Sequence, residues 1–199
     1  MEIRAGVPGD VEQIAALHAE SWRTAYAGIM PSSFLDGPLF EDRLALWRGR
    51  ILEPQSAAGL FVAVDGGAVD GFVYLVPRPD GRVLLDNLHA RPGRTGSGIG
   101  GRLLRQALAW AATEHSGRDV CLEVLRANTR AVAFYERHGA RRTDERMVPV
   151  RAGLRPPRAR VHLGGGVSVA GLAPRDRASQ VRCHHTVRQP FALRSSTGP

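Results

Sequence analysis

The sequence contains no lysine, so all 27 of its basic residues are arginine. A Walker-type phosphate loop ends in a lysine, and this class of nucleotide-binding loop is therefore excluded. Cysteine is also scarce, because Cys121 and Cys183 are too few for a disulfide framework. No apolar run approaches the roughly 20 residues that cross a bilayer, and the first residues do not form a signal peptide. These absences predict a reduced, cytoplasmic protein with no membrane partner.

Acidic residues are almost absent from the end of the chain. Residues 151–199 contain nine arginines and a single acid, Asp176, so they carry the whole net charge of +8. Their only aromatic residue is Phe191, whereas single-stranded nucleic acid is usually held on several aromatic side chains. We interpret the arginine excess as a bias of composition and predict no nucleic-acid partner. The chain divides into a domain at residues 1–150 and an Arg-rich, Gly/Pro-containing tail at 151–199, expected to be largely disordered.

Hydrophobic spacing predicts two helices, then antiparallel strands, then a helix flanked by strands. Helical spacing covers residues 11–22 and 39–52, and the alternation typical of a β-hairpin covers 60–76. The remaining expected elements are strands at 2–5, 83–90, 120–125 and 141–150, helices at 98–115 and 128–138, and a short segment at 160–163 that could add an edge strand. This order predicts an α+β domain with a mixed, mostly antiparallel sheet.

A glycine-rich segment, Arg94 to Gly101, connects an expected strand to an expected helix. Unpaired amides and the positive end of the helix dipole meet there, and both favour a phosphate group. Glycine lets the backbone approach the anion closely, and Arg94 can add a positive charge. The segment therefore predicts a phosphate-binding loop.

The spacing of Gly96, Gly98 and Gly101 also matches the fingerprint of a Rossmann domain, with Glu123 about 20 residues further on. A Rossmann domain would begin its parallel sheet at this loop. Here an antiparallel hairpin precedes the loop, and only one further βα unit follows. An NAD-binding Rossmann protein therefore stays the less favoured alternative.

Two segments resemble the signatures of the GCN5-related N-acetyltransferase (GNAT) family. Residues Leu88 to Leu104 are similar to its acetyl-CoA motif, and Asn128 to Ala140 are similar to its second signature. Thr95 departs from the family, which usually has glutamine or arginine there, and nothing after Val150 clearly supplies the family's last strand. The resemblance implies the acyl-CoA N-acyltransferase fold, with a three-layer α/β/α arrangement. It also implies acetyl-CoA as cosubstrate, no metal, and a monomer or homodimer.

The same resemblance implies where the cofactor binds. The pantetheine arm would lie along the backbone of Leu88 and Ala90, and the diphosphate would sit on the amides of Gly96 to Gly101. The expected cofactor-binding residues are Leu88, His89, Ala90, Arg94, Thr95, Gly96, Ser97, Gly98, Ile99, Gly100, Gly101, Asn128, Ala131 and Tyr135.

Direct acetyl transfer to an amine needs a proton donor for the leaving thiolate and a path for the proton of the amine. Tyr135 matches the family tyrosine that protonates the sulfur, although a buried aromatic beside Phe134 is the alternative. Asp86 is the first choice for the base, because it lies on the strand expected to border the acetyl group. Glu123 and His89 are the alternative candidates for the base.

The acceptor is expected to be a primary amine of a small molecule or peptide that the sequence does not identify. Residues 22–39 should help to form its pocket, as the corresponding helices do in the family. A non-catalytic acyl-CoA-binding or regulatory module is the alternative, since Thr95 departs from the family pattern. Cys183, His184 and His185 offer at most three clustered ligands, so we predict no zinc site there.

Overall fold

The computed structural model describes residues 1–53, 57–141, 144–147 and 159–162, all within the unit Met1–Val169. Its strands are β1 Glu2–Ala5, β2 Gly59–Asp65, β3 Ala68–Pro77, β4 Val83–Ala90, β5 Val120–Val124, β6 Asp144–Met147 and β7 Ala159–His162. Its helices are the 3₁₀ turn η1 Pro8–Asp10, α1 Val11–Ala25, α2 Ser32–Leu35, α3 Leu39–Leu52, α4 Ile99–Glu114 and α5 Thr129–Arg137.

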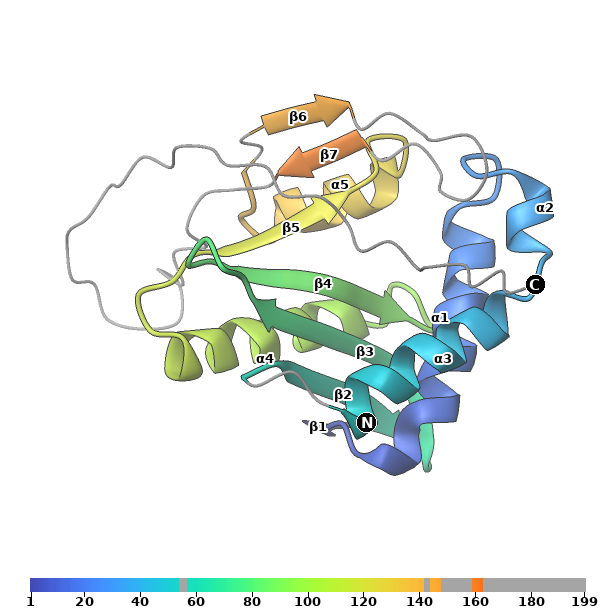
Figure 1. Ribbon diagram of the computed structural model, residues 1–199, viewed down its shortest axis with the longest axis horizontal. Helices are drawn as coiled ribbons and strands as arrows, with labels where there is room; N and C mark the ends of the chain where they lie inside the picture. Colours follow the sequence, from blue (N-terminus) through green and yellow to red (C-terminus); the bar gives the residue numbers. More distant parts are fainter. Residues whose placement is uncertain (54–56, 142–143, 148–158, 163–199) are drawn as a thin grey trace, which may run out of the picture. The chain divides into compact units, whose positions relative to one another are not determined.

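The strands form one sheet in the order β1-β2-β3-β4-β5-β7-β6 (Figure 1). Neighbouring strands run antiparallel, except β4 and β5, which are parallel. The connection between these two strands contains α4, because a parallel pair needs a long crossover. The predicted mixed, mostly antiparallel sheet is therefore confirmed. An all-parallel Rossmann sheet is ruled out.

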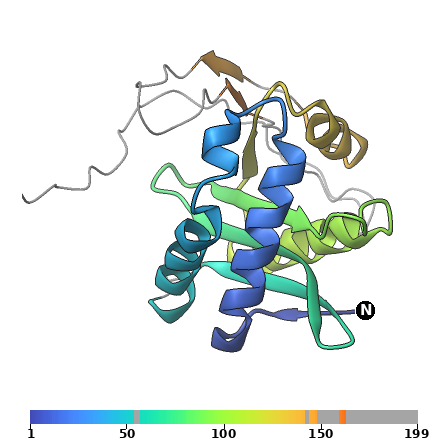
Figure 2. The same ribbon diagram turned by 90° about the vertical axis from the view of Figure 1, so that its right-hand side faces the viewer.

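Helices cover both faces of this sheet (Figure 2). On one face α1 and α3 pack together, and the buried stripe Ile14, Leu17 and His18 of α1 follows helical spacing. Trp47 of α3 is fully buried against the same face. On the other face α4 packs on β2, β3 and β4 through a stripe that includes Leu103. The three-layer α/β/α arrangement expected from the resemblance is present.

Two short strands extend the sheet beyond β5. The strand expected at 141–150 appears as β6, and the segment at 160–163 appears as β7. β7 is not the edge strand that the sequence suggested, because it pairs with β5 on one side and with β6 on the other. β7 thus lies in the sheet although it follows residue 150, where the domain was predicted to end. The rest of the tail predicted for 151–199 lies outside the described residues.

Candidate active site

β4 and β5 are paired only at their beginnings. The register runs only from Val83↔Val120 to Leu85↔Leu122, and β7 pairs with the next residues of β5 along its other side. The two strands diverge from this junction in Figure 1. The second half of β4, which contains Leu88, His89 and Ala90, therefore has β3 on one side and no strand on the other. Because a strand edge carries N–H and C=O groups ready to pair, this opening can hold an extended, polar ligand.

A β-bulge lies where the opening begins. Tyr74 pairs with Asn87 and Leu75 pairs with Leu85, so Asp86 has no partner on β3. Bulges redirect side chains and are common beside active sites. The carboxylate of Asp86 accepts hydrogen bonds from Arg50 at 2.6 Å and from the side chain of Asn87 at 2.7 Å. The predicted base is thus located at the opening, and it forms an ion pair with a residue of α3.

Arg50 is itself held in place by two aromatic rings. Its guanidinium lies 4.7 Å from the ring centroid of Tyr74 and 5.1 Å from that of Trp47. Both rings belong to the cluster between the sheet and α3. The ion pair therefore fixes the Asp86 carboxylate on the α1 and α3 face, which is opposite to α4.

The glycine loop leaves its amides unused. Within the described residues, the backbone N–H groups of Gly96, Gly98, Ile99, Gly100 and Gly101 donate no hydrogen bond, and α4 has no side-chain N-cap. Gly96 and Gly98 have φ values of +93° and +82°, which L-residues with side chains rarely adopt. Unpaired amides at the N-terminus of a 16-residue helix form a favourable site for an anion.

Arg94 does not point to these amides. Its guanidinium lies 2.6 Å from Asp65 and 3.0 Å from Asp70, both near the β2–β3 turn. The hydrogen bond from Arg94, together with the N-terminal amine of Met1 at 3.2 Å, lowers the pKa of the Asp65 carboxyl. The hydroxyl of Ser97 donates to the carbonyl of Arg94. A phosphate contact through the Arg94 side chain stays a prediction, and it requires Arg94 to leave two carboxylates.

Asn128 begins α5. Its Oδ1 accepts a hydrogen bond at 3.1 Å from the amide of Ala131, so the residue is the N-cap of the helix. The cap uses the carbonyl oxygen of the Asn128 side-chain amide. The Nδ2 group has no partner among the described residues, and the contact of Asn128 with the cofactor stays a prediction.

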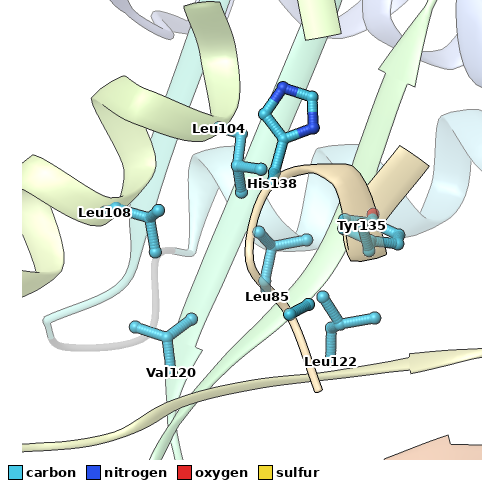
Figure 3. A pocket seen from close by; sticks show the side chains of 8 residues that line it. Leu85, Leu104, Leu108, Val120, Leu122, Tyr135 and His138 are labelled. Atoms are coloured by element: carbon cyan, nitrogen blue, oxygen red, sulfur yellow. The ribbon is translucent and has the colours of Figure 1, made fainter. Parts of the chain in front are cut away.

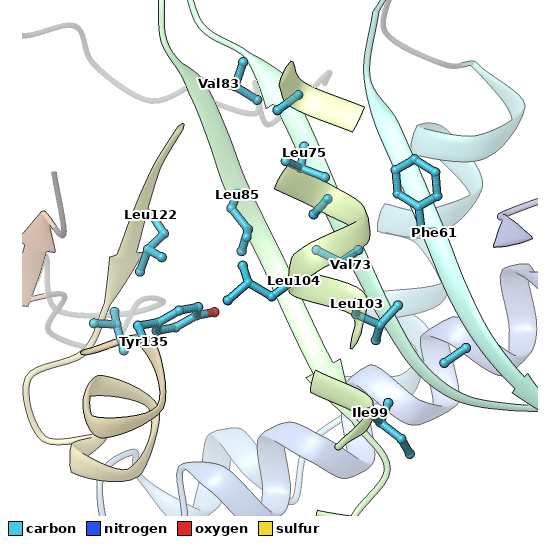
Figure 4. Packing of buried hydrophobic residues seen from close by; sticks show 14 of the residues in the cluster. Phe61, Val73, Leu75, Val83, Leu85, Ile99, Leu103, Leu104, Leu122 and Tyr135 are labelled. Carbon is cyan, nitrogen blue, oxygen red and sulfur yellow. The ribbon is translucent and has the colours of Figure 1, made fainter. Parts of the chain in front are cut away.

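Tyr135 is buried and lines a pocket between α4, α5 and the β4–β5 junction (Figures 3 and 4). The other lining residues are Leu85, Leu104, Leu108, Val120, Leu122, His138 and Ala140. In Figure 4 the phenol extends from α5 toward Leu104 of α4. Burial, and secondarily the nearby Tyr26, raises the pKa of Tyr135 above its ordinary value. The phenol therefore keeps its proton at neutral pH, as a proton donor must.

His89 lies at the end of β4 on the face covered by α1. Its Nδ1 is 2.8 Å from the hydroxyl of Ser21, and its ring lies 4.6 Å from that of His18. Nδ1 of His18 accepts a hydrogen bond at 3.0 Å from the indole N–H of Trp47. No sequence pattern predicts the Ser21–His89 contact, because the two residues are 68 positions apart and belong to different elements.

His89 should make the stability of the protein depend on pH. Burial, and secondarily the charge of Arg43, lowers the pKa of His89 from 6.5 to about 4. Between these values the unfolded chain binds more protons, so the free energy of unfolding falls as pH decreases from 6.5 toward 4. The expected contribution is about 3 kcal/mol. Urea unfolding between about pH 7 and pH 4.5 measures it.

The matched control for this dependence is His89→Gln, which cannot titrate. Every other buried ionisable group, including His18, is present in both proteins. The variant should therefore lose less stability than the wild type over the same pH interval. Equal losses in the two proteins would show that His89 does not carry the effect.

Comparison with known proteins shows which family the chain belongs to. The model of the acetyltransferase (GNAT) family matches residues 14–140. The chain belongs to this family. A Mycobacterium tuberculosis protein named as a probable N-acetyltransferase is 32% identical over 144 residues, which cover 69% of this chain and 78% of that protein.

Solved structures share the GNAT fold. The PaiA N-acetyltransferase of Thermoplasma acidophilum, in complex with coenzyme A, has a TM-score of 0.64 at 22% identity and covers 81% of this chain and 95% of its own. The yncA protein of Salmonella typhimurium, with its cofactor acetyl-CoA, has a TM-score of 0.60 at 18% identity and covers 92% and 99%. The predicted family and fold are confirmed, and the protein is an acetyl-CoA-dependent acetyltransferase.

The sequence predicts no membrane-spanning segment and no metal site, and the structure describes only part of the chain. Among the described residues, no helix is long and apolar enough to cross a membrane. The same residues contain no group of three or more His, Cys, Asp or Glu side chains suited to a metal ion. Cys183, His184 and His185 lie outside them.

Proposed function

We propose that the protein transfers the acetyl group of acetyl-CoA directly to a primary amine of a small molecule or peptide. The observation that carries this proposal is the end of β4–β5 pairing at Leu85↔Leu122. At that point Tyr135 lies on the α4 side, beside Leu85 and Leu122, and Asp86 lies on the α3 side. One opening thus gives access to a proton donor and to a proton acceptor on opposite faces of the sheet.

The residues around the opening fit acetyl-CoA. The unpaired amides of Gly96 to Gly101 suit its diphosphate, and the edge of β4 at Leu88 and Ala90 suits its amide-containing pantetheine arm. Tyr135, which lies beside the last β4–β5 pair, is placed near the point where the thioester end would lie. The similar structures from Thermoplasma and Salmonella were solved with coenzyme A and acetyl-CoA, which supports the same assignment here.

The proposed chemistry needs two proton movements. Bound acetyl-CoA supplies an activated carbonyl group and a thiolate leaving group. The phenol of Tyr135 holds a proton and gives it to the sulfur, since an ordinary phenolate and a thiolate are bases of comparable strength. A carboxylate on the other face of the sheet accepts the proton that the attacking amine must lose. We assign that role to Asp86, with Glu123 and His89 as reserves.

Asp86→Asn tests the assignment of the base. The variant keeps the size of the side chain but removes its capacity to accept a proton, so kcat should fall about 100-fold while acetyl-CoA affinity stays unchanged. Asp80→Asn is the matched control, because Asp80 also pairs with an arginine, Arg82 at 2.7 Å, but lies in the β3–β4 turn. Steady-state kinetics of both variants give the answer. An unchanged kcat in Asp86→Asn would move the role to Glu123 or His89.

The acceptor is best found by release of free coenzyme A thiol in the presence of a panel of amines. The panel should contain polyamines, aromatic amines, amino acids and short peptides. Turnover above the rate of acetyl-CoA hydrolysis with at least one amine is the expected outcome. A protein that binds acetyl-CoA but transfers to no amine in the panel would instead support the non-catalytic, acyl-CoA-binding alternative.

A further inference from the structure

Asp70 of β3 lies in a second β-bulge, beside the end of β4. Ala63 pairs with Gly71 and Val64 pairs with Val69, so Asp70 has no partner on β2. Its side chain is only 9% exposed. Bulges redirect side chains, and this one brings a buried carboxylate to the segment that follows β4.

The carboxylate of Asp70 joins two arginines of that segment, one at each oxygen. Oδ1 accepts a hydrogen bond at 2.9 Å from Nε of Arg91, and Oδ2 lies 3.0 Å from Nη2 of Arg94. Arg91 is bonded to β3 twice more. Its amide donates to the carbonyl of Asp70 at 2.8 Å, and its Nη2 group donates to the carbonyl of Val69 at 2.6 Å. Because a buried carboxylate needs partners for its oxygens, Asp70 holds Arg91 and Arg94 together.

The backbone between Arg91 and α4 forms two successive turns. The amide of Arg94 donates to the carbonyl of Arg91 at 3.0 Å, and the amide of Ser97 donates to the carbonyl of Arg94 at 3.3 Å. The hydroxyl of Ser97 donates to the same carbonyl. The hydrogen bonds of this segment therefore lead back to Arg91 and Arg94, and through them to Asp70.

The other end of the segment is held by the next residue of β3. Ile99 and Leu103 of α4 pack directly on Gly71, where an added Cβ would lie 2.7 Å from Cγ2 of Ile99 and 2.9 Å from Cδ1 of Leu103. Both side chains belong to the cluster between α4 and the sheet (Figure 4). Asp70 and Gly71 thus fix the two ends of the glycine-rich segment. A loop that is fixed in advance loses less conformational entropy when a ligand binds.

We propose that Asp70 is a positioning residue for cofactor binding, which acts through Arg91 and Arg94 to hold the glycine loop ready for the phosphates. This inference rests on the proposed function, since that function places acetyl-CoA on the loop. In this role Arg94 ties the loop to β3. If Arg94 instead left its carboxylates to contact a phosphate, Asp70 would compete with the ligand, and loss of its charge would strengthen binding.

Asp70→Asn distinguishes these two roles by the sign of its effect. The asparagine keeps the shape of the side chain, but its Nδ2 group cannot accept a hydrogen bond, so one of the two arginines is released. The dissociation constant of acetyl-CoA should rise about tenfold, while kcat at saturating acetyl-CoA should stay within about twofold of the wild type. Isothermal titration and steady-state kinetics measure the two quantities. S-acetylpantetheine, which carries no phosphate, should bind equally well to both proteins.

Two control variants separate loop positioning from other effects. Asp10→Asn also removes a buried carboxylate that pairs with an arginine, Arg4 at 2.7 Å, but Asp10 belongs to η1 and not to the loop. This variant should lose stability and keep its affinity. Asp65→Asn removes the other carboxylate that contacts Arg94, whose side chain is 44% exposed. Its affinity should change less than about twofold, because exposed ion pairs contribute little.

The proposal is overturned if folded Asp70→Asn binds acetyl-CoA as well as the wild type or more tightly. Tighter binding would assign Arg94 to a phosphate. Equal losses in Asp70→Asn and Asp10→Asn would assign the effect to stability, and an equal loss for S-acetylpantetheine would show that the loop is not the route.

Should Asp70→Asn fail to fold, as judged by thermal unfolding, Arg91→Lys replaces it. Lysine keeps the charge but loses the fork that binds Asp70 and Val69 together, so affinity should fall about threefold. Wild-type affinity in this variant would equally overturn the proposal. Absence of acetyl-CoA binding by the folded wild-type chain is a different failure, because it would overturn the proposed function itself.

Discussion

Replacing Gly98 by valine is expected to raise the dissociation constant of acetyl-CoA at least 100-fold. Gly98 is the last residue before α4, with φ at +82°, and a β-branched residue strongly disfavours this conformation. A Cβ at this position would meet no protein atom within 4 Å. The space is therefore open to the anion that the neighbouring amides should bind, and a valine side chain would occupy it. Isothermal titration of the purified variant measures the loss.

Gly81→Val is the matched control for this substitution. Gly81 lies in the β3–β4 turn with φ at +85°, and a Cβ there also meets nothing within 4 Å. The two variants therefore carry similar backbone strain, but only one of them changes the loop. Gly81→Val should lose stability and keep its affinity for acetyl-CoA. Equal losses of affinity in the two variants would mean that strain, and not the anion site, accounts for the effect.

Tyr135→Phe is expected to lower kcat by about 100-fold to 1,000-fold, because it removes the proton donor for the leaving thiolate. The phenylalanine ring fills the same pocket beside Leu104 and Leu122, so acetyl-CoA affinity should change less than about threefold. Since burial raises the pKa of Tyr135, the wild-type rate should show no loss from tyrosine ionisation up to about pH 10. Steady-state kinetics with saturating acetyl-CoA measure both effects.

Tyr74→Phe is the corresponding control. Tyr74 is also a buried tyrosine, but it belongs to the opposite face of the sheet and lies beneath Arg50. Its replacement keeps the ring and should leave kcat within about threefold of the wild type. If Tyr135→Phe retained full kcat, water or another group would have to protonate the thiolate. If it weakened acetyl-CoA binding without changing kcat, Tyr135 would be a cofactor contact only.

The features that the sequence predicted well are determined by residues that lie close together in the chain. The glycine-rich connection, the start of α4 next to Gly98 and the start of α5 next to Asn128 are each encoded within a few positions. Periodicity likewise located the buried stripes of α1 and α4, because side-chain spacing fixes the face that a helix buries. These local signals are sufficient to predict the strand–loop–helix connection and the order of elements around it, while phosphate binding by the loop stays a prediction.

The features that the sequence did not predict depend on contacts between distant segments. The bulge at Asp86 is a register shift against β3, which no pattern within β4 reveals. The ion pair of Asp86 with Arg50 spans 36 positions. Arg94 was expected at the phosphate, yet Asp65 and Asp70 compete for its guanidinium. The roles of the individual site residues therefore remain predictions, and the experiments above address them one by one.

Direct measurement of acetyl-CoA binding by the 199-residue chain tests the central claim. This claim is that the β4–β5 opening and the glycine loop form one cofactor site. Isothermal titration should show saturable binding of one molecule per chain, with a dissociation constant in the micromolar range. Coenzyme A should compete with acetyl-CoA, and NAD should not. A folded protein that binds neither acetyl-CoA nor coenzyme A would contradict the account.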